Sequence, residues 1–586
     1  MKIKALSLAA ALAVTAGISD ASACTNLIAG KGATADSSVM VTYAADSHSL
    51  YGELYYQPAA KHPAGAMRKV VEWDTGKYLG EIPEVAETYN VVGNMNEHQV
   101  VIAESTWGGR AELQDTTGNS IIDYGSLMFI ALQRSKTARE AIDVMTSLVA
   151  EYGYASSGES FSIADKNEVW VMELIGKGAE KGAVWIAVRI PDNAISGHAN
   201  HPRIHKVNFK DKKNVLYSKD VVDFARKRGW YEGKDEDFSF AMTYGEWDYG
   251  SFRGCDARVW SYFRHFSKDA EKYYAWCNGE STEPMPLYII PDRKVTLADM
   301  QERMRDHFEG TPFDMNNDLG AGPNHVPYRW RPMYYEVDGK KYLHERAVAT
   351  QQTGWSFVSQ SRSYLPDAVG GVLWFGTDDA NTCVYMPFYC SMTEIPLQVR
   401  HGNGDMNTFS WTSNFWMNTW VANQAYNRYD LMIDDIRKVQ GALETKFQST
   451  RADREKELQQ LLMTDHSAFV AAVNADGAAI AQEATEAYRE LGQYLLVRFM
   501  DGNMKKVDEN GNFIWPGFGD NMRVLNWIID RCEGKAEATE TAIGYIPMPE
   551  DIDLTDLDMD MDTLKSILKV DKDVWTREAE EIEEHY

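Results

Sequence analysis

The stretch Ala-Ser-Ala-Cys at Ala21–Cys24 constrains this chain more than any other, because a cysteine directly follows an apolar leader. A short basic start and an uncharged apolar run over residues 5–18 precede it. That run is shorter than the stretch of about 20 residues that crosses a bilayer. Small residues stand three positions and one position before the expected cut after Ala23, as a leader peptidase requires. We therefore predict that residues 1–23 are a removed export signal and that the mature chain is periplasmic or extracellular.

The cut would make Cys24 the first residue of the mature protein, with a thiol and a free α-amine on one residue. An α-amine has a pKa of about 8, so part of it is unprotonated at neutral pH and able to take the thiol proton. A nucleophile and its general base would then come from the same residue. The N-terminus therefore predicts nucleophilic catalysis by cysteine.

A lipoprotein signal is an alternative interpretation of Cys24, since there too a cysteine follows the cut, and its sulfur is lipidated. The chain would then be a surface lipoprotein or binding protein anchored through Cys24. That signal usually has leucine or another aliphatic residue where this chain has Ala21. The lipid anchor is therefore the less favoured interpretation.

The composition narrows the classes of partner. The chain has 586 residues, of which 44% are hydrophobic, enough for more than one folded unit. Its net charge of −27 argues against nucleic acid as a partner. No segment after the leader is long and apolar enough to span a membrane. We expect a soluble protein without a membrane span, for which a homo-oligomer stays open.

Strand-like runs dominate the chain as far as residue 398. Short β-branched and aromatic runs between Gly, Asn and Asp predict strands at 38–43, 99–103, 160–164, 168–174, 183–190, 371–375 and 382–387. Helices are predicted at 126–134, at 297–308 and at 137–152, where Thr137 and Glu140 resemble a capping box. Strands with helices between and after them predict an α+β layered domain.

The pattern changes after about residue 401. Apolar residues recur there at helical spacing over residues 413–437 and 440–500, with few Gly or Pro. We therefore divide the mature chain into a layered domain over residues 24–400 and a mainly helical C-terminal region over residues 401–586.

The segment that begins at Cys24 has the pattern of a strand, a turn at residues 35–37 and a second strand that leads to Asp46. Such a hairpin would hold the terminal residue on a sheet. Asp46 is expected to bind an ammonium group, either that of Cys24 or that of a substrate. Its alternative role is turn chemistry, as an Asx turn or a cap.

Several motifs lie along the first 400 residues. They are Cys-Thr-Asn-Leu-Ile at 24–28, Ala-Ala-Asp-Ser-His at 44–48, Asn-Met-Asn-Glu-His at 94–98, Gly-Glu-Ser-Phe-Ser at 158–162, Gly-His-Ala-Asn-His-Pro-Arg at 197–203 and Leu-Pro-Asp-Ala-Val-Gly-Gly at 365–371. Together they resemble the secreted cysteine dipeptidases of peptidase family C69, which are N-terminal nucleophile (Ntn) hydrolases. The resemblance is looser over the helical tail.

This resemblance implies an αββα Ntn-hydrolase sandwich that hydrolyses dipeptides or short peptides through a thioester on Cys24. Asn200 matches the position of an oxyanion-hole amide, and losing one such donor costs about 3 kcal/mol. Arg258 resembles an arginine that the relatives keep near the nucleophile. Loop capping by Asn200 and a surface ion pair of Arg258 are the alternatives. Many relatives also carry an arginine a few residues before Asp46, where this chain has Tyr43.

Three histidines, His198, His201 and His205, follow one another at i, i+3 and i+7, a spacing that suggests a metal site if they share one helix. Gly197 and Pro202 argue against one helix that would align the three rings. We therefore expect neither a metal nor an organic cofactor. Within enzymes, the same constellation also fits hydrolysis of other amides, such as acylated amino acids or β-lactams.

Overall fold

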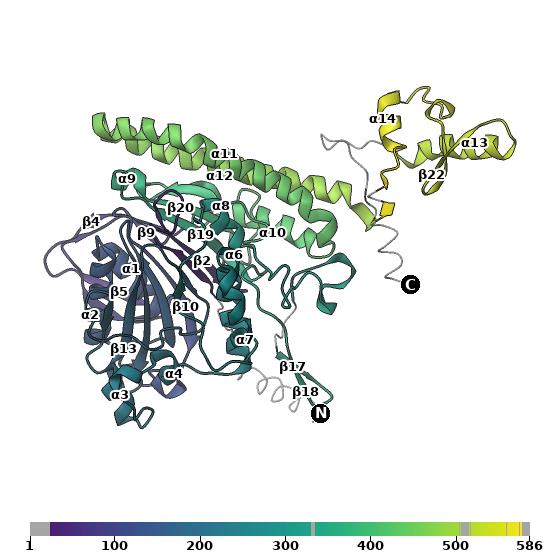
Figure 1. Cartoon of the computed structure of the whole chain (residues 1–586). Coiled ribbons are helices and arrows are strands. Elements are labelled where there is room, and N and C mark those ends of the chain that lie inside the picture. The colour runs from purple at the N-terminus through teal and green to yellow at the C-terminus, as the bar shows by residue number, and fades with distance from the viewer. Residues whose placement is uncertain are drawn as a thin grey trace, which may run out of the picture. The chain divides into compact units, whose positions relative to one another are not determined.

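The computed structural model describes residues 24–329, 334–502, 504, 515, 517–557, 559–572 and 575–576. The leader expected over residues 1–23 lies outside them. The chain divides into two units, Met1–Gly492 and Gln493–Tyr586, which are described here one at a time (Figure 1).

Two antiparallel sheets form the centre of the first unit. The seven-stranded sheet has the order β16 (Tyr288–Ile289), β14 (Ile195–His198), β1 (Asn26–Ala29), β2 (Val39–Asp46), β19 (Thr353–Ser361), β20 (Val372–Thr377) and β21 (Met386–Tyr389). The eight-stranded sheet has the order β15 (Val215–Tyr217), β13 (Glu180–Ile190), β12 (Val169–Lys177), β11 (Gly158–Ala164), β10 (Val101–Gly108), β9 (Met95–Asn96), β8 (Val91–Val92) and β3 (Tyr56–Gln57).

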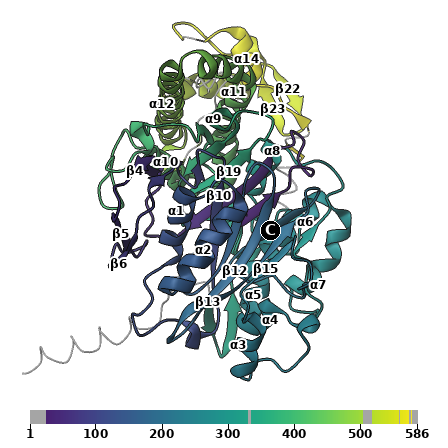
Figure 2. The same ribbon diagram turned by 90° about the vertical axis from the view of Figure 1, so that its left-hand side faces the viewer.

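The two sheets pack face to face, and helices cover their outer faces. Strand β2 contacts β10 and β11 of the other sheet, and β1 contacts β10. Helices α1 (Tyr124–Arg134) and α2 (Ala138–Tyr152) lie on the eight-stranded sheet, as Figure 2 shows. The seven-stranded sheet is contacted by α6 (Ala257–Phe266), α8 (Leu297–Arg303), α10 (Asn414–Ala425) and α11 (Tyr429–Thr464). The unit is therefore a mixed α+β structure of four layers.

The central strands are buried on both faces, including the polar residues that they carry. All eight residues of β2 are buried, and so are all seven of β11. A strand with one face in water would alternate between polar and apolar side chains. The polar residues of these strands therefore lie in the interior, where each needs a hydrogen-bond partner.

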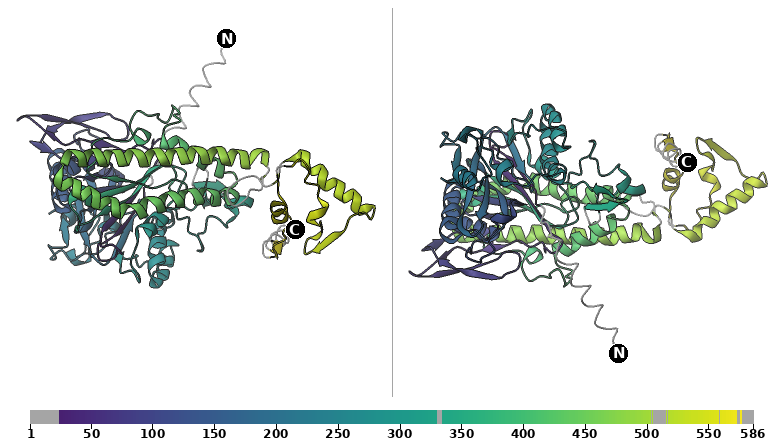
Figure 3. Two further views of the ribbon diagram at one scale, coloured as in Figure 1. Left: turned by 90° about the horizontal axis from the view of Figure 1, so that it is seen from above. Right: turned by 90° about the horizontal axis from the view of Figure 1, so that it is seen from below.

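Two long helices form a hairpin at the end of the first unit. α11 ends at Thr464, and α12 (His466–Arg498) begins after Asp465, whose side chain accepts a hydrogen bond from the N–H of Ala468 at 3.0 Å. The two helices run side by side in Figures 1 and 3. Arg454 bridges them by an ion pair to Asp476, with Nε 2.7 Å from Oδ2.

The second unit has a small core of its own. Trp527 of α13 (Asn521–Cys532), Ile552 and Leu564 of α14 (Met561–Ile567) pack together there. This unit also contains a hairpin of β22 (Ala538–Thr541) and β23 (Gly544–Pro547), in a stretch for which the sequence predicts mainly helix.

Most predicted elements occur near their expected positions, and the ends differ for local reasons. Thr137 caps α2 by accepting a hydrogen bond from the N–H of Glu140 at 3.2 Å. The helix expected over residues 297–308 ends at Arg303, and Phe308 has a φ of +66°, which a right-handed helix excludes. In the described part of the chain, no helix is long and apolar enough to cross a membrane.

Candidate functional site

Cys24 lies where the two sheets meet, two residues before the start of β1. Thr25 forms a bridge with Ala44 of β2 through hydrogen bonds in both directions, at 3.0 and 3.3 Å. β1 then pairs with β14 on its other side, with Asn26 opposite His198. The nucleophile candidate is therefore held between two strands, and only 3% of its surface is exposed.

Two polar side chains surround the thiol of Cys24. Its Sγ lies 3.4 Å from Oε1 of Glu104 on β10 and 3.7 Å from the hydroxyl of Tyr43 on β2. The Tyr43 hydroxyl also donates a short hydrogen bond to Glu104. Burial raises the pKa of the Cys24 thiol well above its usual value, and the negative charges of Glu104 and Asp46 raise it further. The thiol is therefore held in its neutral form.

Arg258 connects Cys24 to Asn200. It comes from the start of α6, where a π-helical turn over Phe252–Asp256 precedes the helix, and it is fully buried. One of its nitrogens, Nη1, donates to the carbonyl oxygen of Cys24 at 2.9 Å, and Nη2 donates to Oδ1 of Asn200 at 2.8 Å. Burial lowers the pKa of the guanidinium to about 10, so it stays charged at neutral pH. Arg258 therefore contacts the main chain of Cys24, not its thiol.

Asn200 follows β14 and has a φ of +54°, a left-handed conformation that asparagine adopts more readily than most residues. Its Nδ2 donates to the carbonyl oxygen of Thr106 at 2.6 Å, while its Oδ1 accepts from Arg258. The amide is thus fixed between the two sheets with its N–H side toward β10. One of the two N–H groups on Nδ2 is thereby used by Thr106.

Asp46 ends β2, and its carboxylate already has partners. Oδ1 accepts from Thr353 at 2.6 Å, and Oδ2 accepts from Nη2 of Arg346 at 2.6 Å. Burial raises the pKa of Asp46, and the charge of Arg346 opposes that shift. Its backbone N–H lowers the pKa of the Cys24 thiol by hydrogen bonding. Asp46 therefore joins the site through its main chain, while its side chain binds an arginine.

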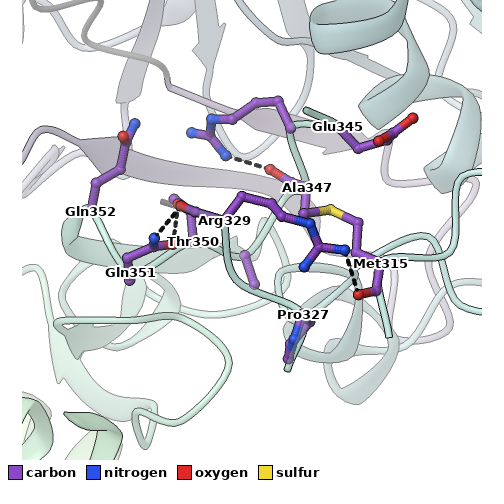
Figure 4. Close-up of a pocket in the computed structure, with 10 residues that line it drawn as sticks. Met315, Pro327, Arg329, Glu345, Ala347, Thr350, Gln351 and Gln352 are labelled. Atoms are coloured by element: carbon purple, nitrogen blue, oxygen red, sulfur yellow. Dashed lines mark hydrogen bonds between the residues drawn. The ribbon is translucent and has the colours of Figure 1, made fainter. Parts of the chain in front are cut away.

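Figure 4 shows a small hollow that Arg346 helps to line. Arg346, Arg329 and Gln352 are among the residues that line it. Arg329 donates to the carbonyl oxygen of Met315 at 2.8 Å and accepts, through its own carbonyl oxygen, from Gln351 at 2.7 Å. Two arginines therefore line this hollow, and one of them, Arg346, also binds Asp46.

Of the carboxyl groups near Cys24, the sequence pattern indicated Asp46 but neither Glu104 nor Glu159. Glu104 and Thr106 lie on the same face of β10, and Glu159 of β11 is opposite Thr106. Thr106 donates to Oε1 of Glu159 at 2.7 Å. Burial raises the pKa of both glutamates, and the charge of Glu104 raises that of Glu159 further. The signal in the sequence is the run of three polar residues at 104–106 in an otherwise apolar strand.

The three histidines do not converge. His198 lies between the hydroxyls of Ser105 and Ser162, at 2.7 and 2.8 Å, and burial lowers its pKa to about 3. His201 pairs with Asp256 at 3.2 Å, whereas His205 contacts a serine. Among the described residues, no group of three or more His, Cys, Asp or Glu side chains is arranged to hold a metal.

Comparison with known proteins separates the chain into two stretches. The profile of peptidase family C69 matches residues 23–442, and that of the phosphoenolpyruvate carboxykinase C-terminal P-loop domain matches residues 442–586. A probable dipeptidase of Latilactobacillus sakei is 24% identical over 392 residues, which are 64% of this chain and 75% of that protein.

Two further similarities are more limited. A phosphoenolpyruvate carboxykinase (GTP) of Renibacterium salmoninarum is 52% identical over 77 residues, which are 13% of each chain. The structure of penicillin V acylase from Agrobacterium tumefaciens aligns with a TM-score of 0.28 and 12% identity, over 64% of this chain and 87% of that one.

Proposed function

Because this chain belongs to peptidase family C69, we propose that it is an exported cysteine dipeptidase that hydrolyses dipeptides or other short peptides through a thioester on Cys24. The observation that carries the proposal is the network around Arg258. This one side chain binds both the carbonyl group of Cys24 and the side chain of Asn200, which lies 176 positions later in the sequence. The guanidinium group of Arg258 thereby fixes the proposed nucleophile and the proposed oxyanion donor relative to each other.

The reaction begins with the α-amine that a cut after Ala23 would release. This amine takes the thiol proton of Cys24, directly or through a water, and the thiolate attacks the scissile carbonyl carbon. Asn200 and backbone N–H groups stabilise the tetrahedral oxyanion. The amine then gives its proton to the leaving nitrogen, and the C–N bond breaks. Water finally hydrolyses the thioester and restores the thiol.

The layers of the first unit support the same proposal. A sandwich of two sheets between two helical layers, with the nucleophile at a strand end, is the arrangement expected of an αββα Ntn hydrolase. Cys24 lies two residues before the start of β1 in the seven-stranded sheet. A probable dipeptidase is among the relatives, which supports short peptides as substrates.

Mass spectrometry of the mature N-terminus combined with substitution of Cys24 tests this proposal. We expect a free cysteine at position 24 and loss of dipeptidase activity in Cys24→Ala and Cys24→Ser. Cys532→Ser is the matched control, because that thiol is exposed and lies in the second unit. A diacylglyceryl group on Cys24 would instead indicate a lipid anchor, and full activity of either Cys24 variant would refute the mechanism.

A panel of substrates separates the proposed reaction from hydrolysis of other amides. We expect dipeptides to be cleaved with a higher kcat/KM than acylated amino acids or β-lactams. A preference for either of the other two classes would replace the dipeptidase assignment while leaving the role of Cys24 intact.

A further inference from the structure

Glu104 and Glu159 form a buried acidic pair beside the nucleophile that lacks a cation. Glu104 is 2% exposed and Glu159 is fully buried. Glu104 contacts Tyr43 and the thiol of Cys24, Glu159 contacts Thr106, and the two carboxyl groups hydrogen-bond to each other, which requires a proton on one of them. Within the described part of the chain, no lysine, arginine or histidine forms an ion pair with either carboxyl group.

Each glutamate also has one buried oxygen that no N–H, hydroxyl or thiol group reaches. Oε2 of Glu104 and Oε2 of Glu159 accept no hydrogen bond from such a donor among the described residues. A buried carboxylate without a counter-ion is costly, and it is compensated by a raised pKa with a retained proton or by a paired cation. One shared proton leaves one negative charge on the pair, and two cationic groups are close enough to offset it: the α-amine that a cut after Ala23 would give Cys24, and the α-ammonium group of a substrate.

Substrate geometry shows how the second of these groups would reach the pair. In a peptide, the α-nitrogen of a residue lies about 2.5 Å from its own carbonyl carbon. The attacking sulfur must approach that carbon to about 3–3.5 Å. An N-terminal ammonium group next to the scissile bond is thus carried to within a few ångströms of Sγ of Cys24. Oε1 of Glu104 lies 3.4 Å from that sulfur.

Asp46, the other acidic residue near Cys24, is not available for this role. Its two oxygens accept hydrogen bonds from Arg346 and Thr353. A substrate ammonium group would have to displace the arginine, whereas Oε2 of Glu104 accepts from no N–H or hydroxyl group among the described residues.

We propose that Glu104, supported by Glu159, binds the α-ammonium group of the substrate, so that the enzyme selects peptides whose free N-terminal residue is the acyl donor. This inference rests on the proposed function. It makes Glu104 a specificity-determining residue, and Glu159 a positioning residue that acts through Glu104.

The test compares two substrates that differ in one ammonium group. Alanyl-alanine carries it, and N-propionyl-alanine has the same acyl chain without it. For the mature wild-type protein we expect kcat/KM to be higher for alanyl-alanine by about 10- to 100-fold, the usual effect of one charged hydrogen bond. Equal or greater activity on N-propionyl-alanine would overturn the inference while leaving the peptidase intact. Inactivity on every amide tested would instead refute the proposed function.

Substitution then assigns the preference to the carboxyl group. We expect Glu104→Gln to lower the ratio of kcat/KM for alanyl-alanine to kcat/KM for N-propionyl-alanine by about 10- to 100-fold, because any effect of the substitution on the Cys24 thiol is common to both substrates. Glu104→Asp should recover part of the preference. Equal losses on both substrates would show that Glu104 serves Cys24 or its amine instead, and would refute the inference. Retained activity on N-propionyl-alanine also shows that the variant folds.

Two further variants complete the design. Glu159→Gln keeps the size of the side chain and is expected to reduce the preference for alanyl-alanine less than Glu104→Gln does, because Glu159 is not in contact with the sulfur of Cys24. Glu180→Gln, on the exposed start of β13, is the control and should change neither substrate. A larger effect of Glu159→Gln would assign the ammonium group to Glu159 and overturn the role given to Glu104.

Discussion

The guanidinium group of Arg346 donates a hydrogen bond of 2.6 Å to the carboxylate of Asp46 in the interior of the first unit. The two residues are 300 positions apart in the sequence. Their charges compensate each other next to Cys24, so neither the burial of Asp46 nor that of Arg346 leaves an isolated ion. The carboxylate of Asp46 is therefore held in a fixed position by Arg346 and Thr353.

Breaking this ion pair on one side should destabilise the protein. We expect Arg346→Met to lower the free energy of unfolding by about 3 kcal/mol, because it leaves a buried carboxylate without its cation. The double variant with Asp46→Asn should lose less than the two single variants together. Urea unfolding measures all three. An Arg346→Met protein that unfolds at the wild-type urea concentration would contradict this view of the pair.

Asn200 should affect the chemical step rather than substrate binding. We expect Asn200→Ala to lower kcat by about 100- to 1,000-fold with little change in KM, as for other oxyanion donors. Asn200→Asp should lower kcat to a similar extent, because a carboxylate has no N–H to donate. Steady-state kinetics distinguish the outcomes, with thermal unfolding as the check that the fold survives. A change confined to KM would rule out the oxyanion role.

The charge of Glu104 should be visible in the reactivity of the thiol. It raises the pKa of Cys24, so Glu104→Gln is expected to lower that pKa and increase the fraction of thiolate at pH 8. The pKa is measured from the rate at which iodoacetamide alkylates Cys24 across pH 6–10, with the product quantified by peptide mass spectrometry. If the midpoint of the profile moves upward or stays in place, Glu104 does not carry a negative charge beside the sulfur.

His198 should make the protein less stable in acid. Its pKa is lowered to about 3 in the folded state, so below pH 6.5 the unfolded chain binds a proton that the folded protein excludes. Stability therefore falls as the pH drops from about 6.5 to 3, by about 1.4 kcal/mol per pH unit for one such group. His198→Gln should reduce the difference in unfolding free energy between pH 7 and pH 5. An unchanged difference would mean that His198 is not the group responsible.

The first unit should require residues beyond position 442, where the match to peptidase family C69 ends, in order to fold. Glu455 of α11 binds the buried Arg362 through both oxygens, at 2.7 and 2.9 Å, and Glu444 binds the buried Arg305 at 2.6 Å. A chain that ends at residue 442 loses both carboxylates and is expected to be insoluble or inactive. A chain that ends at residue 502 keeps them and should retain activity. The yield of soluble protein and its dipeptidase activity test this, and an active chain ending at 442 would contradict it.

The sequence alone determined the features that depend on neighbours along the chain. The apolar run at residues 5–18, the small residues at 21 and 23 and the position of Cys24 are local features of the sequence, and so are the strand and helix patterns. For that reason β2, β11, α1 and α2 lie close to their predicted ranges. The family resemblance added Asn200 and Arg258. In the structure, Arg258 donates hydrogen bonds to the carbonyl oxygen of Cys24 and to the side chain of Asn200.

Only the tertiary structure decided which charges surround the nucleophile. Periodicity shows that a strand is buried, but not which strand of the opposite sheet it faces. Glu104 reaches Cys24 because β10 packs against β1 and β2, and Arg346 reaches Asp46 from 300 residues away. Buried charges must find partners wherever the fold brings them, since water is absent there. The position of Cys24 in the chain is thus a local feature of the sequence, whereas the charged groups around its thiol are brought there by the packing of distant strands.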